Sequence, residues 1–116
     1  MITNTVRIIS MENIKKICAD VRAEYVEKKG TVTSWERDIA SDIAYRSSMN
    51  GRESFACIGK VNGIEHFWVR FEDTIFDATA SKFGFDGEVL VIAKSEAPQY
   101  EEEHYVRIEN KPPIMG

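Results

Sequence analysis

The sequence predicts an α+β domain in which N-terminal helices pack on a small antiparallel β-sheet. In the first half of the chain, apolar residues recur at spacings of three and four, which is typical of helices. After Gly51 the apolar period changes to two, which is typical of strands. Helices followed by a run of strands favour an α+β fold. A length of 116 residues suits one core, so we expect residues 1–116 to form a single domain.

The first helix is expected over Met11–Lys29, after a short β-prone segment at residues 6–9. Ser10 precedes it as a candidate N-cap, and Gly30 is placed to end it. One apolar stripe runs along this helix and comprises Ile14, Ile17, Cys18, Val21 and Tyr25.

A second helix is predicted from the capping box that begins at Thr33. In such a box Thr33 accepts from the backbone N–H of Glu36, whose side chain reaches back to the N–H of Thr33. Ser34 then lies in the first helical turn. Asn50 and Gly51 are suited to the left-handed turn that closes a helix. The expected buried face comprises Trp35, Ile39, Ala40, Ile43 and Ala44.

Three antiparallel strands are expected next, because two tight turns separate three β-prone runs. Asn62-Gly63 is a strong hairpin signal between 54–61 and 64–71, and Glu72-Asp73 leads into 74–77. Two more strands complete the expected sheet, a buried one within the apolar run 88–93 and a last one over 104–108, after the acidic loop 101–103.

Composition argues against several classes of function. The net charge of −4 and the pI near 5.2 argue against nucleic acid as a partner, because phosphate binding needs a concentrated basic face. The chain has no run apolar enough to span a bilayer and no leader pattern, so we expect a cytoplasmic protein without a membrane partner. Neither cysteine lies in a metal-binding spacing, so no metal or other cofactor is expected.

His66 and Asp77 are the pair best placed for chemistry. Alternation puts His66 and Trp68 on one face of their strand, and Asp77 lies in the next strand along the chain. If the intervening turn closes a hairpin, the carboxylate reaches the imidazole, which fixes its tautomer and leaves the other nitrogen as a base. The same spacing also fits a histidine that is hydrogen-bonded for structure alone.

Several segments resemble the pattern H-x-W-V, I-x-D-x-T-A-x-Q-F-G of small papain-fold and transglutaminase-like proteins. They read His66-Phe67-Trp68-Val69, Thr74-Ile75-Phe76-Asp77-Ala78-Thr79-Ala80 and Lys82-Phe83-Gly84. The resemblance covers about Thr33 to Tyr105. It implies a papain-like or transglutaminase-like core and acyl transfer on a protein, peptide or other amide substrate: hydrolysis, deamidation or transamidation. In that family the histidine is the general base and the aspartate orients it.

The nucleophile departs from this pattern. The family places a cysteine at the start of a helix about thirty residues before the histidine, and here that position is Ser34, followed by Trp35. Three interpretations of Ser34 are open. It is a natural serine nucleophile, it is an engineered replacement of the cysteine, or the cysteine has been lost in a catalytically inactive binding or inhibitory module. When the helix pattern of the family is instead aligned with residues 37–41, Ser34 no longer occupies the nucleophile position. This second alignment supplies no cysteine either. Trp35 and Trp68 are expected as core residues or walls of the substrate pocket.

Cys18 and Cys57 are the alternative nucleophiles. Cys18 lies on the apolar stripe of the first helix, where burial raises a thiol pKa. Cys57 lies in the strand before the Asn62-Gly63 turn, nearly opposite His66 when residues are counted outward, but without a helix dipole to favour the thiolate. A plain structural domain is the remaining interpretation.

Overall fold

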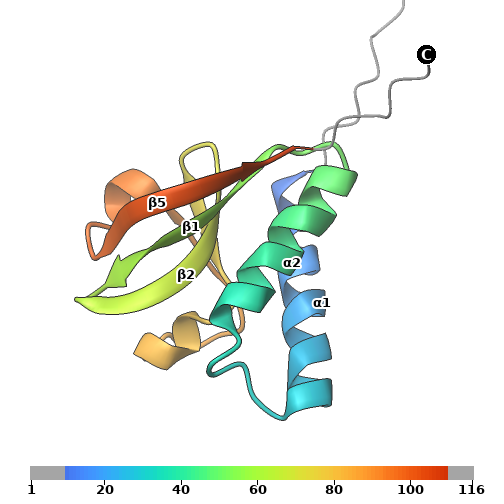
Figure 1. Cartoon of the computed structure of the whole chain (residues 1–116), viewed down its shortest axis with the longest axis horizontal. Coiled ribbons are helices and arrows are strands. Elements are labelled where there is room, and N and C mark those ends of the chain that lie inside the picture. The colour runs from blue at the N-terminus through green and yellow to red at the C-terminus, as the bar shows by residue number, and fades with distance from the viewer. Residues whose placement is uncertain (1–9, 110–116) are drawn as a thin grey trace, which may run out of the picture.

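A computed structural model describes residues 10–109 as two helices packed on a five-strand antiparallel sheet (Figure 1). The strand order across the sheet is β4-β3-β2-β1-β5. The α+β class predicted from the sequence is therefore confirmed. The elements are α1 (Met11–Lys29), α2 (Glu36–Met49), β1 (Ser54–Val61), β2 (Ile64–Phe71), β3 (Thr74–Asp77), η1 (Ala80–Phe83), β4 (Leu90–Ala93), η2 (Lys94–Glu96) and β5 (Tyr100–Ile108).

Helix α1 has the bounds and caps that the sequence predicts. The Ser10 hydroxyl accepts a 3.2 Å hydrogen bond from the backbone N–H of Asn13. Gly30 adopts the left-handed conformation at φ 77° and donates its N–H to the carbonyl of Val26. The β-prone segment at residues 6–9 lies outside the described residues.

The predicted capping box before α2 is wrong. The helix begins at Glu36, its N-cap is Trp35, and no side chain caps it. The preceding residues form a turn instead, in which Trp35 N–H donates to the Val32 carbonyl and Thr33 N–H donates to the Thr31 hydroxyl. Ser34 has φ 74° and lies before the helix, because this turn needs a left-handed residue at that position.

Two tight turns join the three central strands β1, β2 and β3. Asn62 and Gly63 both take positive φ values, 51° and 79°, which match the twist of a two-residue hairpin between β1 and β2. Glu72, at φ 52°, begins the second turn, which joins β2 to β3 with Phe71 opposite Thr74. Both predicted hairpins are confirmed.

The two edge strands differ from expectation. β4 is not buried: it is an edge strand and Val91 is 40% exposed, because its only partner in the described sheet is β3. β5 begins at Tyr100, before the expected start, and takes in the acidic residues 101–103. Glu101 and Glu102 pair with Lys60 and Gly59 of β1, and the register shifts past Glu103 before His104 pairs with Ile58, so backbone pairing overrides the low strand propensity of this acidic run.

Alternation along β2 divides the apolar residues between two sides of the sheet. Phe67, Val69 and Phe71 belong to the cluster that α1 and α2 cover, together with Ile14 and Ile39. A second cluster lies on the other side, around Trp68, and comprises Cys57, Val61, Trp68, Ile75, Ala97 and Tyr100. His66 shares the alternation of Trp68 and therefore faces this second side. Neither described helix is long and apolar enough to cross a membrane.

Candidate functional site

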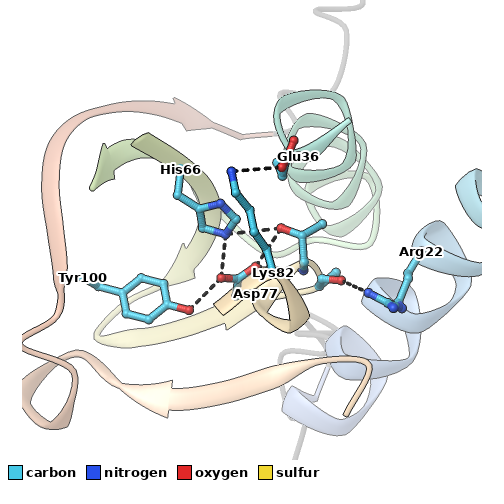
Figure 2. A network of polar contacts seen from close by, with 8 residues as sticks. Arg22, Glu36, His66, Asp77, Lys82 and Tyr100 are labelled. Carbon is cyan, nitrogen blue, oxygen red and sulfur yellow. Dashed lines mark hydrogen bonds and ion pairs between the residues drawn. The ribbon is translucent and has the colours of Figure 1, made fainter. Parts of the chain in front are cut away.

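His66 and Asp77 meet in the interior of the sheet, as their spacing predicts. His66 comes from β2 and Asp77 ends β3, and the side chains are 0% and 1% exposed. The Nε2 atom of His66 lies 2.9 Å from Oδ2 of Asp77 (Figure 2). The predicted contact is thus present, and its partner atom on the ring is Nε2.

The Asp77 carboxylate holds three neighbours together. Its Oδ2 accepts from the Tyr100 hydroxyl at 2.7 Å as well as facing His66, and its Oδ1 accepts from the backbone N–H and the hydroxyl of Thr79 at 2.9 and 3.0 Å. Thr79 gives its one hydroxyl proton to Asp77, so its oxygen can only accept from His66 Nε2, 3.3 Å away. Both contacts therefore place the ring proton on Nε2 and leave Nδ1 with a free lone pair.

The Nδ1 atom of His66 is buried and has no hydrogen-bond partner among the described residues. Aromatic side chains surround the ring: Phe83 meets it edge-on at 4.7 Å between centroids, and Trp68 stacks at 6.3 Å. The indole Nε1 of Trp68 is also buried and has no hydrogen-bond partner within residues 10–109. A buried acceptor without a hydrogen bond costs about 1–3 kcal/mol of stability. A hydrogen-bond donor that reached Nδ1 would remove this cost.

The segment that follows Asp77 is tied to both helices. Arg22 of α1 donates to the carbonyl of Ala78 at 2.7 Å, and Lys82 of η1 lies 3.4 Å from the Glu36 carboxylate at the start of α2 (Figure 2). Phe83, the last residue of η1, contacts the His66 ring. These ties hold η1 against His66 and help to exclude solvent from it.

The structure does not join Ser34 to the pair. Ser34 is exposed, and because His66 Nδ1 has no partner in the described chain, the serine hydroxyl is not bonded to it. Trp35 also packs elsewhere: its ring lies 6.0 Å from that of Tyr25, with the Lys29 ammonium 4.5 Å from its centroid. Of the residues predicted for the site, the structure assembles His66, Asp77 and Trp68.

Neither cysteine offers a thiolate. Burial, with the nearby Asp77 charge, raises the pKa of Cys18 to about 12. Cys57 lies opposite Trp68, and Gly59 occupies the place opposite His66, so the register predicted from counting was wrong. Burial first, and then the bond from its thiol to Glu102 at 3.2 Å, raises the pKa of Cys57 to about 12. Both thiols stay protonated at neutral pH.

Sequence reasoning missed Tyr100 and gave Thr79 only a role in shaping the chain. Thr79 carries a local signal, since a threonine two residues after an aspartate can bond back to its carboxylate. Tyr100 carries none, because it lies 23 residues beyond Asp77 and reaches it through the tertiary fold. Burial and the Asp77 charge raise the pKa of the Tyr100 hydroxyl above its ordinary range, which keeps it a donor.

The site is thus a buried histidine–aspartate pair, supported by a threonine and a tyrosine, with one unpaired ring nitrogen. No cluster of metal-binding side chains occurs in residues 10–109. Comparisons with protein families, with curated proteins and with solved structures find no match to this chain.

Proposed function

We propose that this domain has a papain-like or transglutaminase-like core and acts as a non-catalytic binding or inhibitory module. Two features support the core: a helix precedes an antiparallel meander that carries the histidine on its second strand, and the aspartate ends its third strand. The resemblance of the segments around His66, Asp77 and Phe83 supports it as well. The expected partner is a protein or peptide.

The unpaired Nδ1 atom of His66 carries this proposal. A general base acts on a hydroxyl or thiol that lies within about 2.6–3.2 Å of it, or one water away. Within the described residues no donor reaches Nδ1, and the ring is fully buried. Ser34 faces solvent, and both cysteines are protonated and packed in the core. Within residues 10–109 the pair therefore has neither a nucleophile in contact with Nδ1 nor an open path to a substrate.

In this proposal the pair keeps a structural role. Asp77 links His66 of β2 to Tyr100 of β5, and the backbone N–H of Thr79 ties the following turn to the same carboxylate. A buried polar network of this kind is costly to break, because every member left behind is an unsatisfied polar group. In this role His66 and Asp77 stabilise the fold.

Acyl transfer is the second candidate, and the tautomer of His66 favours it. With its proton on Nε2 facing Asp77, the ring offers Nδ1 as the base that a serine hydroxyl requires. Ser34 Oγ would attack the amide carbonyl and pass its proton to Nδ1, and the departing amine would take that proton. Water or a second amine would then release the acyl group. Both Ser34 and η1 would have to move to open this route.

Replacing Ser34 with cysteine separates the two candidates. We expect the new thiol of Ser34→Cys to react with iodoacetamide like any exposed cysteine, with a rate that rises with pH toward a pKa of about 8.5. Ser41→Cys is the matched control, because it introduces a thiol at another exposed serine, on the helix α2 that follows Ser34. Mass spectrometry of the adduct gives the rate at each site.

His66→Gln supplies the decisive comparison. If removal of the imidazole leaves the reaction rate of Ser34→Cys unchanged, the site is not built to activate a nucleophile. A thiol at position 34 that reacts at pH 6 at least about tenfold faster than the control, and loses this advantage with His66→Gln, would establish the acyl-transfer candidate instead. Thermal unfolding of each variant checks that the fold is retained.

A further inference from the structure

The short helix η1 covers His66 through a chain of side-chain contacts. The ring of Phe83 meets the imidazole edge-on at 4.7 Å between centroids. The Lys82 ammonium lies 5.6 Å from the centroid of that phenyl ring. The same ammonium lies 3.4 Å from the Glu36 carboxylate at the start of α2 (Figure 2). This ion pair therefore fastens η1 to α2 while Phe83 lies against His66.

The second half of η1 is held by local bonds and by this partly exposed ion pair. The backbone N–H of Lys82 donates to the Thr79 carbonyl, and that of Gly84 donates to the Ser81 carbonyl. Gly84 takes φ 89°, and residues 86–88 beyond it are exposed and belong to no helix or strand. The Lys82 side chain is 33% exposed, and ion pairs that solvent reaches are weak. Segments held in this way open at low free energy.

The first half of η1 is anchored more firmly. Ala80, its first residue, is buried. The preceding residue, Thr79, donates both its backbone N–H and its hydroxyl to the Asp77 carboxylate. A hinge at the first residues of η1 would therefore move Phe83 and leave the bonds of Asp77 in place.

The Phe83 ring has room to leave His66. A pocket of about 320 Å³ lies beside η1, and its walls include Phe83, Phe85, Leu90 and Ile92. His66 does not line this pocket. A phenyl ring that turned into it would keep an apolar environment and would uncover the imidazole.

The closed position of η1 leaves one polar atom of the site unsatisfied. Nδ1 of His66 is buried and has no partner among residues 10–109, whereas Nε2 faces Asp77 and Thr79. A buried acceptor without a hydrogen bond destabilises the state that contains it. Opening η1 would let a donor reach Nδ1, and this gain offsets part of the loss of the Phe83 contact.

We propose that η1 is a lid that opens locally over His66, with the Lys82–Glu36 ion pair as its latch. The open form presents Nδ1 as a hydrogen-bond acceptor to a donor group of a protein or peptide. This use of the open site rests on the proposed binding function. The opening itself is a property of the fold and does not rest on that function.

Diethyl pyrocarbonate measures the opening in the full chain, because it acylates a neutral imidazole through its free lone pair, here that of Nδ1. We expect His66 of the wild type to react slowly, at a rate that urea does not change below the unfolding transition. A rate limited by global unfolding would instead rise with urea as steeply as the unfolding equilibrium. Peptide mass spectrometry gives the rate, and the exposed His104 is the internal standard.

Lys82→Met removes the charge of the latch and keeps an apolar side chain beside Phe83. It should raise the reaction rate of His66 about fivefold and leave that of His104 unchanged. Glu36→Gln should have the same effect, and the double variant should add little, because both changes break one ion pair. Lys60→Met is the matched control: it removes an exposed lysine of β1 and should leave the rate at His66 unchanged.

Two results would overturn the proposal. One is a reaction of His66 that follows global unfolding in the Lys82→Met protein as it does in urea-unfolded wild type. The other is a rate in Lys82→Met and Glu36→Gln that equals the rate in Lys60→Met. Phe83→Ala, which removes the cover itself, must also speed the reaction. The alkylation of Ser34→Cys tests the proposed function separately, so a failure of one leaves the other standing.

Discussion

The hydroxyl of Tyr100 donates a 2.7 Å hydrogen bond to Oδ2 of Asp77, which joins the first residue of β5 to the last residue of β3. These strands are not neighbours, because β2 and β1 lie between them. The tyrosine ring crosses above Trp68, edge-on at 5.0 Å between centroids, to reach the carboxylate. The Tyr100 side chain therefore links the edge strand β5 to the His66–Asp77 pair.

Tyr100→Phe should lower the free energy of unfolding by about 1–2 kcal/mol, because it removes a buried hydrogen bond to a carboxylate and keeps the ring. Urea unfolding followed by circular dichroism measures the change. Tyr105→Phe removes the same hydroxyl from an exposed site and should shift stability by less than about 0.5 kcal/mol. Equal effects of the two variants would contradict the structural role of the Tyr100 hydroxyl.

Diethyl pyrocarbonate should modify His104 and spare His66. The reagent acylates accessible neutral imidazole, and His104 is exposed whereas His66 is 0% exposed. We expect His66 to react at least about a hundredfold more slowly, since it must wait for local or global opening. Peptide mass spectrometry locates the adducts, and both histidines should react alike in urea. Rapid modification of folded His66 would show that the site is open to solvent.

Stability should fall as the pH rises above about 9. Cys18 and Cys57 have their pKa values raised from 9.0 to about 12 in the folded protein. Between these values the unfolded chain has lost thiol protons that the folded chain keeps, so the slope of unfolding free energy with pH is negative. The fall is roughly 1 kcal/mol per pH unit for each thiol. Tyr100, whose pKa is also raised, adds to it above pH 10.

Urea midpoints at pH 8 and pH 10, measured with a reductant present, test this dependence. Cys57→Ala removes one of the two titrating thiols, so its midpoint should drop less between the two pH values than that of the wild type. Cys57→Ala also loses stability through packing, but this loss is present at both pH values. It therefore does not affect the change in urea midpoint between them. A variant with the wild-type pH dependence would contradict the assignment to Cys57.

Gly59→Ala should destabilise the protein by about 3 kcal/mol or more, because a side chain there has no room. A Cβ at this position would collide with the backbone carbonyl of Glu101 and lie 2.9 Å from the Trp68 ring. Lys60→Ala, at the next and exposed position, should change stability by less than about 0.5 kcal/mol. Thermal unfolding compares the two, and a Gly59→Ala protein of wild-type stability would show that β5 is not seated as described.

Local sequence signals predict most of the elements of this protein and the contact at the centre of its site. Ser10 and Gly30 bound α1 because their side chain and backbone act within one turn. Asn62-Gly63 and the two-residue turn at 72–73 place β2 between β1 and β3, so that Asp77 reaches His66. These are short-range effects of turn chemistry and alternation, and residues close in sequence carry them.

Two other features of the site are visible only in the folded chain. The pairing of β5 with β1 turns an acidic run into a strand and brings Tyr100 to Asp77, and no local preference encodes either result. The turn before α2 keeps Ser34 outside the helix, where its hydroxyl is not bonded to His66. For β5 the physical reason is strand pairing between distant segments, which outweighs the small intrinsic preferences of single residues. For Ser34 the reason is the turn at residues 31–35, whose hydrogen bonds form in place of the predicted capping box.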